Sequence, residues 1–194
     1  MFHSLCRSMA IAAFAVALLA ATPHALANES QVELPLTIEW VDLMPAHILE
    51  SIESMPMLEH DYSEDAVDPF SDEWEDPYAE LWNEILSSTE VVDKYAGKLI
   101  RLPGFIVPLD VDEQNRVLSF FLVPYFGACI HVPPPPPNQL IYVENSDLAK
   151  KIDVHNMYTP FWLTGYLEIK QTQHELGLAA YTIKMTNLNE YRWE

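Results

Sequence analysis

The feature of this sequence that most restricts its fold is a run of five prolines at residues 133–137. Proline has no backbone N–H to donate, and its ring holds φ near the value of a polyproline helix. A run of this length cannot lie in the middle of a β-sheet, so we expect a stiff segment along an edge or across the mouth of a barrel. Two side chains suited to metal binding or nucleophilic chemistry, Cys129 and His131, stand directly before it.

Cys129 and His131 are predicted to lie on the same side of the chain. Pro133 disfavours the helical conformation at Val132, which indicates an extended backbone in this stretch. If both residues share that geometry, side chains two positions apart point the same way. The thiol and the imidazole would then be close enough to act together.

Three interpretations of this pair stay open. In the first, Cys129 is a small buried residue, His131 is a satisfied polar group, and the prolines only shape a long connection. In the second, the two side chains bind zinc or copper together with ligands from elsewhere in the chain. In the third, His131 activates Cys129 as a nucleophile or redox thiol, although no third orienting group is evident. The candidate further ligands are His155 and His174, followed by His47, His60 and carboxylates of the acidic segment.

Residues 1–27 have the layout of a secretory signal peptide. A basic residue near the start precedes a short apolar stretch, and Ala-Leu-Ala at residues 25–27 forms a small-x-small end. The apolar stretch is too short to span a membrane comfortably, so we expect cleavage before Asn28 and no membrane span afterwards. Cleavage also removes Cys6, which leaves Cys129 without a partner for an internal disulfide.

The charge of the chain argues against several classes of partner. The net charge is −19; without the basic residue of the predicted signal peptide, 9 basic and 29 acidic residues give 9 − 29 = −20. This balance argues against nucleic acid and anionic lipid. Between Asn28 and Glu80 there are 16 Asp or Glu residues and no Lys or Arg. Such a segment is a solvated arm, a docking arm for a basic surface, or a weak divalent-cation sink.

We interpret residues 28–96 as an acidic, partly helical extension and residues 97–194 as a core domain. Helices are predicted at about residues 45–55 and from Pro77 to about Ser87. The core has apolar, β-rich runs, with a hairpin turn at residues 110–115 and a short helix near Ser146. The runs lie at residues 97–109, 116–126, 138–145, 160–170 and 178–188.

Five strands with a helix between the third and the fourth are typical of a small closed or partly open barrel of the oligonucleotide/oligosaccharide-binding (OB) type. A two-layer sandwich is the alternative fold. Pro103 and Gly104, inside the first run, predict a bulge or bend there.

The stretch from Gly104 to Val143, with PFWLTGYLEI and AAYTIKM after it, resembles the bacterial domain of unknown function 3299. The resemblance extends over about residues 38–188 and includes the early WVDLMP. Family members are similar to exported proteins of Gram-negative bacteria and are associated with ABC transporters and zinc-responsive systems. The family's signature falls on Pro108, Leu109, Pro124, Cys129, His131, Pro133, Pro134, Pro135, Asn138 and Gln139.

The resemblance therefore implies a periplasmic protein that assists an ABC transporter or a system of metal homeostasis. Together with the residues, it leads us to expect a non-enzymatic accessory protein whose partner is a periplasmic protein or a transporter permease. Cys129 and His131 are the expected site, with zinc or copper as the candidate metal. A cysteine-dependent enzyme or redox protein that uses Cys129 with His131 is the alternative.

Overall fold

The structure, a computed structural model, describes residues 33–55, 78–129, 134–144, 148, 151–152 and 158–192. The predicted signal peptide and about half of the acidic segment lie outside the described residues. Most residues of the short helix predicted near Ser146 also lie outside the described residues.

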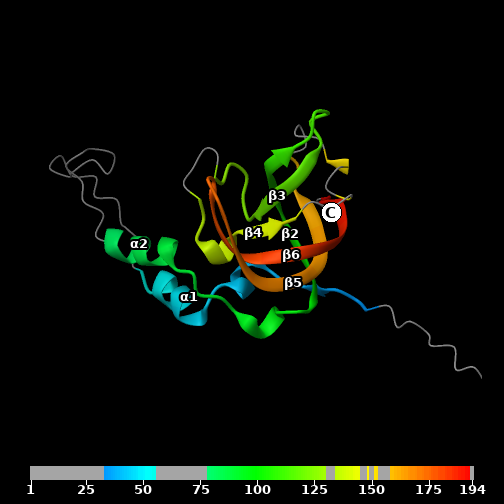
Figure 1. Cartoon of the computed structure of the whole chain (residues 1–194). Helices are drawn as coiled ribbons and strands as arrows, with labels where there is room; N and C mark the ends of the chain where they lie inside the picture. The colour runs from blue at the N-terminus through cyan, green and yellow to red at the C-terminus, as the bar shows by residue number, and fades with distance from the viewer. Residues whose placement is uncertain are drawn as a thin grey trace, which may run out of the picture. The chain divides into compact units, whose positions relative to one another are not determined.

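The sheet consists of six strands, of which five form a closed ring of hydrogen-bonded neighbours (Figure 1). The strands are β1 (Leu36–Thr37), β2 (Leu99–Val111), β3 (Val117–Val123), β4 (Ile141–Val143), β5 (Phe161–His174) and β6 (Gly177–Glu190). Their order is β1-β2-β3-β4-β6-β5, and a further pairing of β2 with β5 closes the ring. The β1–β2 and β4–β6 pairs are parallel, and all other pairs are antiparallel.

The mainly β architecture expected from the sequence is therefore confirmed. Each of the five predicted apolar runs contains or overlaps one of the strands β2 to β6. β1 was not predicted, because two residues are too few to show an alternating pattern.

Strand β2 pairs with β5 along its first part and with β3 along its second part, and Gly104 lies where the pairing partner changes. Residues 99–104 pair with β5, and residues 105–111 pair with β3. A Cβ at Gly104 would lie 2.7 Å from the carbonyl oxygen of Val123, so the glycine permits a close approach of β3. Of the bulge or bend predicted at Pro103 and Gly104, the bulge is wrong, because the register shifts lie further along, between Pro108 and Val111. The bend stays a prediction.

The predicted hairpin turn between β2 and β3 is confirmed. The Asp112 carboxylate accepts hydrogen bonds from the backbone N–H groups of Gln114 and Arg116, each at 2.9 Å. The Arg116 guanidinium lies 2.7 Å from the same carboxylate and holds the pKa of Asp112 below its usual value. Asn115 has a φ of 58°, a conformation that asparagine tolerates better than most residues.

The hydrophobic core fills the inside of the ring. Alternate residues of β2 and β5 point inward, among them Ile100, Leu102, Leu163 and Leu167, each with no exposed surface. β3 is buried along almost its whole length, because its other face packs against a second apolar cluster outside the ring.

Within the described residues, two helices and two 3-10 helices precede the ring. They are η1 (Trp40–Leu43), α1 (Ala46–Glu53), α2 (Ala79–Ser87) and η2 (Asp93–Tyr95). The positions of α1 and α2 agree with the predicted helices within about two residues. No helix within the described residues is long and apolar enough to cross a membrane.

The segments around these helices contribute to the main core. Ile38, Leu43 and Tyr95 are buried in the same cluster as the strands. The Tyr181 hydroxyl of β6 accepts a hydrogen bond from the Val92 N–H at 2.6 Å and donates to the Leu43 carbonyl at 3.1 Å. Glu33–Glu194 form one compact unit. The predicted boundary between an extension and a core, at residues 96 and 97, stays a prediction.

Candidate functional site

Cys129 lies in a tight turn that follows β3. The chain leaves the strand at Val123, and Gly127 has a φ of 87° and Cys129 a φ of 65°. A positive φ is uncommon for a residue with a Cβ, and glycine is the residue that adopts it without strain. The expectation that Cys129 shares an extended geometry with His131 is therefore wrong at Cys129, because a positive φ is not an extended conformation.

The Cys129 thiol is half-buried and forms no disulfide. It packs against the second apolar cluster, which includes Val107, Phe121 and Leu140. Burial disfavours the charged thiolate and raises the pKa of Cys129 from 9.0 to about 11. At neutral pH the described surroundings keep this residue a thiol, whereas a nucleophilic cysteine needs a lowered pKa.

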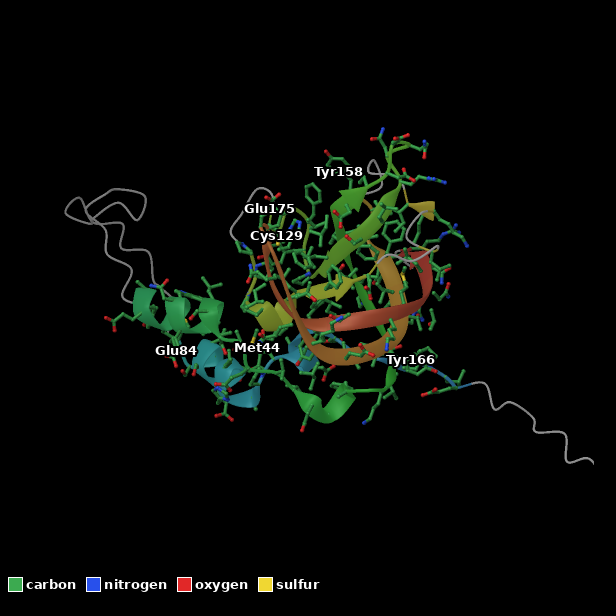
Figure 2. All side chains as sticks on the ribbon, viewed as in Figure 1. Met44, Glu84, Cys129, Tyr158, Tyr166 and Glu175 are labelled. Atoms are coloured by element: carbon green, nitrogen blue, oxygen red, sulfur yellow. The ribbon has the colours of Figure 1, made fainter. Side chains whose placement is uncertain are left out.

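His174, at the end of β5, borders the same cluster. Its ring meets the ring of Phe121 edge to face, with 6.0 Å between the centroids. Leu176, in the β5–β6 turn, packs against the same cluster as Cys129. Figure 2 labels Cys129 and Glu175, the residue before Leu176 in this turn. Cys129 and His174 therefore approach one apolar cluster from two different segments.

The hydrogen bonding of His174 bears directly on its suitability as a metal ligand. The backbone N–H of Leu176 donates to His174 Nδ1 at 3.2 Å, so the proton of the neutral ring is on Nε2. A ligating histidine normally binds through an unprotonated nitrogen while the other nitrogen donates a hydrogen bond. In this arrangement, His174 would have to give up its bond to Leu176 to bind a metal.

The described part of the proline run packs on the chain's own surface. Pro136 has the polyproline values φ −52° and ψ 150°, and the 3-10 helix η3 (Pro137–Gln139) follows at once. Pro135 and Pro137 are buried. Pro134 Cβ lies 3.4 Å from the position that a Cβ of Gly177 would occupy, which places the run against the β5–β6 turn.

Asn138 and Gln139 tie the end of the proline run to the preceding segments. The Asn138 side-chain amide donates to the Glu90 carbonyl at 3.1 Å, and that of Gln139 donates to the Trp40 carbonyl at 3.0 Å. Both side chains are buried. The Asn138 Oδ1 is a buried oxygen with no hydrogen-bond partner in the described structure. Sequence reasoning placed these two residues in the family signature but assigned them no role.

The predicted metal ligands are brought together only in part. His131, His155 and His60 lie outside the described residues, and His47 is on α1, where its Nε2 is 3.3 Å from Glu90 Oε2. Within the described residues, no group of three or more His, Cys, Asp or Glu side chains is placed to hold a metal ion. Whether Cys129 and His131 bind a metal together stays a prediction.

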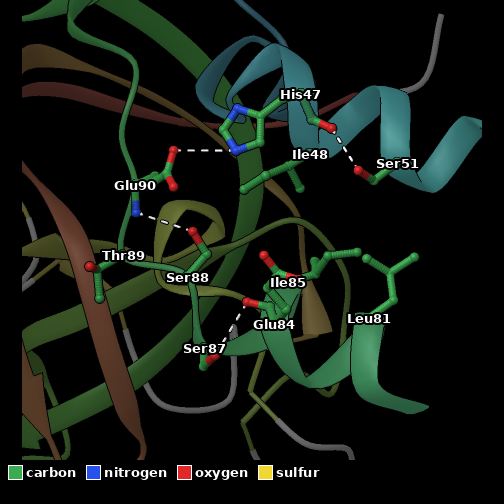
Figure 3. Close-up of a pocket in the computed structure, with 10 residues that line it drawn as sticks. All are labelled: His47, Ile48, Ser51, Leu81, Glu84, Ile85, Ser87, Ser88, Thr89 and Glu90. Carbon is green, nitrogen blue, oxygen red and sulfur yellow. Dashed lines mark hydrogen bonds and ion pairs between the residues drawn. The ribbon is translucent and has the colours of Figure 1, made fainter. Parts of the chain in front are cut away.

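A cavity of about 350 Å³ lies between α1 and α2, and Cys129 does not line it (Figure 3). His47, Ile48 and Ser51 line it from α1. The remaining lining residues come from α2 and the segment that follows and are Leu81, Glu84, Ile85, Ser87, Ser88, Thr89 and Glu90. Sequence reasoning named His47 only as a remote metal ligand and did not predict this cavity.

An aromatic surface lies beside Cys129. The rings of Phe105 and Phe126 are 6.1 Å apart, and those of Phe126 and Tyr158 are 5.1 Å apart. Tyr125, Phe126 and Tyr158 are exposed. Phe105 also lines a shallow pocket of about 170 Å³ that includes Trp40 and Pro124.

Comparisons with known proteins find one family and one solved relative. The model of the DUF3299 family, described as a protein of unknown function, matches residues 40–190. The crystal structure of a DUF3299 family protein from Pseudomonas aeruginosa PAO1 is similar, with a TM-score of 0.57 and 32% sequence identity. The similarity covers 83% of this chain and 99% of that chain. A search of curated proteins returned no match.

Proposed function

Because the chain belongs to the DUF3299 family of proteins of unknown function, we propose that it is a non-enzymatic periplasmic accessory protein. It assists an ABC transporter or a zinc or metal-homeostasis system, and the segment from Cys129 to Gln139 is its working site. The observation that favours this proposal over the cysteine-dependent enzyme is the packing of the half-buried Cys129 against the second apolar cluster. Burial raises its pKa to about 11, and this disfavours the thiolate that a catalytic cysteine uses.

We also infer that the closed ring of strands is an OB-like barrel. Five strands, β2 to β6, take part in the ring, and β4 runs parallel to β6 while the other ring pairs are antiparallel. β2 is shared between β3 and β5, as the long first strand of a partly open Greek-key barrel is. Binding at OB barrels uses a strand face and its flanking loops, and the Cys129 turn leaves one of these strands.

The side chains at this site, a thiol and an imidazole, are suited to binding a soft or borderline metal ion. Cys129 and His131 are two residues apart, so their Cα atoms lie within about 7 Å by chain length alone. Thiolate and imidazole are ligands of zinc and copper, and metal binding would displace the thiol proton despite the raised pKa. His155 is a further candidate, whereas His174 fits less well because of its bond with the Leu176 N–H.

Native mass spectrometry of the exported protein, purified without chelator, tests this part of the proposal. We expect the wild-type protein to carry zinc or copper and the Cys129→Ser variant to lose it. His174→Gln is the informative second variant, because it should retain the metal if His174 is not a ligand. A protein that has the unmodified mass, with and without Cys129, would refute metal binding and leave the segment with a structural role.

The cysteine-dependent enzyme is the competing function, and alkylation separates it from the proposal. With a pKa of about 11, Cys129 has about 100-fold less thiolate at neutral pH than a thiol of pKa 9, so it should react with iodoacetamide more slowly than such a thiol. Rapid alkylation of the folded protein at neutral pH would instead reveal an activated thiol. A free cysteine peptide provides the reference rate.

The location and the partner need their own measurements. Export predicts that the protein purified from a periplasmic fraction begins at Asn28. The accessory role predicts that a permease subunit co-purifies with the folded protein. A protein that keeps its first 27 residues in the cytoplasm would overturn the periplasmic role.

A further inference from the structure

The α1–α2 cavity has the chemistry of a site for a positively charged side chain. Ile48, Leu81 and Ile85 provide an apolar wall, and Glu84 and Glu90 provide two carboxylates (Figure 3). In the described structure, the Glu84 carboxylate and one oxygen of Glu90 have no hydrogen-bond or ion-pair partner. The cavity therefore combines an apolar surface with uncompensated negative charge.

Two of the hydroxyl groups that line the cavity, those of Ser51 and Ser87, add acceptors. Ser51 Oγ donates its hydrogen to the His47 carbonyl at 2.9 Å, and Ser87 Oγ donates to the Asn83 carbonyl at 2.7 Å. Ser88 Oγ accepts from the Glu90 N–H at 3.3 Å. Because the Ser51 and Ser87 hydrogens are already used within their helices, their oxygens can only accept from a ligand. Together with the two carboxylates, these oxygens favour a ligand that is rich in donors.

The charge around the cavity reinforces this selection. From Asn28 to Asp93 the sequence has no Lys or Arg, so no basic side chain of this segment competes for the two carboxylates. His47 pairs with only one oxygen of Glu90. The net charge of −19 draws cationic partners toward the molecule over longer distances.

The shape of the cavity distinguishes an organic cation from a metal ion. Glu84, Glu90 and His47 do not converge closely enough to form a metal-binding group of three. An arginine side chain fits better, because its aliphatic stem covers apolar residues while its five N–H donors reach several acceptors. Lysine has the stem but fewer donors in fixed directions.

The site is also held in place by the signature segment. The side chain of Asn138 donates to the backbone carbonyl of Glu90, the residue that bears one of the two carboxylates. Asn138 itself is fully buried. The end of the proline run thus fixes the rim of the α1–α2 cavity.

We propose that the α1–α2 cavity binds an arginine side chain of a partner protein, with Glu84 and Glu90 as the residues that bind the guanidinium. This proposal rests on the helices and not on Cys129. It therefore stands or falls independently of metal binding, and it assigns a docking point to the partner of the proposed accessory function.

The test is an NMR titration of the ¹⁵N-labelled protein with N-acetyl-arginine methylamide at low ionic strength. We expect saturable shifts of the backbone amides of His47 and of residues 84–90. The uncharged citrulline analogue has nearly the same shape and should produce no such shifts. The Glu84→Gln, Glu90→Gln double variant should weaken arginine binding by about tenfold or more, since it removes two charge-assisted contacts.

The matched control is Glu50→Gln, an exposed carboxylate of α1 that does not line the cavity and should leave the affinity unchanged. Shifts that are equal for citrulline, that spread evenly over the acidic surface, or that do not saturate would overturn the proposal. Magnesium chloride is the second probe. If it produces the same shifts more strongly than arginine does, the cavity is a cation site of another kind and the proposal fails.

Discussion

Cys129 combines two unfavourable conditions, since its backbone has a positive φ of 65° and its thiol is half-buried. A non-glycine residue in this left-handed conformation costs roughly 1–2 kcal/mol relative to its usual conformation. Glycine at this position would remove that strain, and Gly127 already shows that the turn accommodates positive φ. The side chain at position 129 is therefore kept at a cost in stability, which is typical of residues that serve packing or binding.

The backbone strain at Cys129 can be measured with two substitutions that both remove the thiol. We expect Cys129→Gly to be more stable than Cys129→Ala by about 1 kcal/mol, because only glycine adopts this φ without strain. Urea denaturation followed by circular dichroism gives the two free energies of unfolding. An alanine variant as stable as the glycine variant would show that the turn relaxes and that no strain is stored there.

The raised pKa of Cys129 also predicts a dependence of stability on pH. The folded pKa of about 11 lies above the reference value of 9.0, so the thiol is harder to ionise in the folded state than in the unfolded state. Its contribution is fully present below pH 9 and is lost as the pH rises from 9 to 11. We expect the free energy of unfolding of the wild-type protein to fall in this range relative to that of Cys129→Ala. A constant difference between the two proteins would show that Cys129 titrates normally.

At the scale of elements, η3 connects three parts of the molecule. It follows the proline run, it precedes β4, and its two amide side chains reach the carbonyl groups of Trp40 and Glu90. These bonds join segments that are 48 and 99 residues apart in the sequence. The Asn-Gln pair thus fixes where the first segments of the chain lie against the ring.

Replacing Gln139 with leucine measures how much the hydrogen bond from Gln139 to the Trp40 carbonyl contributes to stability. The variant keeps a similar volume but leaves the Trp40 carbonyl without the amide donor, so we expect a loss of about 1–3 kcal/mol of stability. Chemical denaturation measures the loss. Gln171→Leu, at an exposed position of β5, is the matched control and should change stability by less than about 0.5 kcal/mol. Equal effects of the two substitutions would assign Gln139 no structural role.

Sequence reasoning predicted elements better than it predicted the geometry between them. α1, α2 and the strands β2 to β6 follow from periodicity and turn residues, which are local properties. The conformation of Cys129 could not be predicted in this way, because it depends on how the turn meets the second apolar cluster. The bonds of Asn138 and Gln139 depend on contacts between distant segments, which a single sequence does not show. For the same reason the α1–α2 cavity was not predicted.

At the scale of the whole molecule, the segments before residue 97 contribute side chains to the core and do not merely pack on its outside. Ile38 and Leu43, ahead of α1, and Tyr95 are buried in the main cluster. The Tyr181 hydroxyl, deep in this core, bonds to the backbone of Leu43 and Val92 at once. Burial raises the pKa of Tyr181, which keeps the hydroxyl neutral and able to donate. The ring and the preceding segments therefore share one set of buried contacts.

This shared core predicts the behaviour of a chain that contains residues 97–194 alone. Complete burial of Ile38, Leu43 and Tyr95 contributes about 1.5–3 kcal/mol each, so their removal costs on the order of 5 kcal/mol. A domain of this size has only about 5–15 kcal/mol of net stability, so the shortened chain should unfold at much lower denaturant concentration or not fold cooperatively. Thermal and urea unfolding of residues 97–194 beside residues 33–194 provide the comparison. Equal midpoints would show that residues 97–194 are an autonomous domain, whereas a large loss would move the boundary of the folded unit to the start of β1.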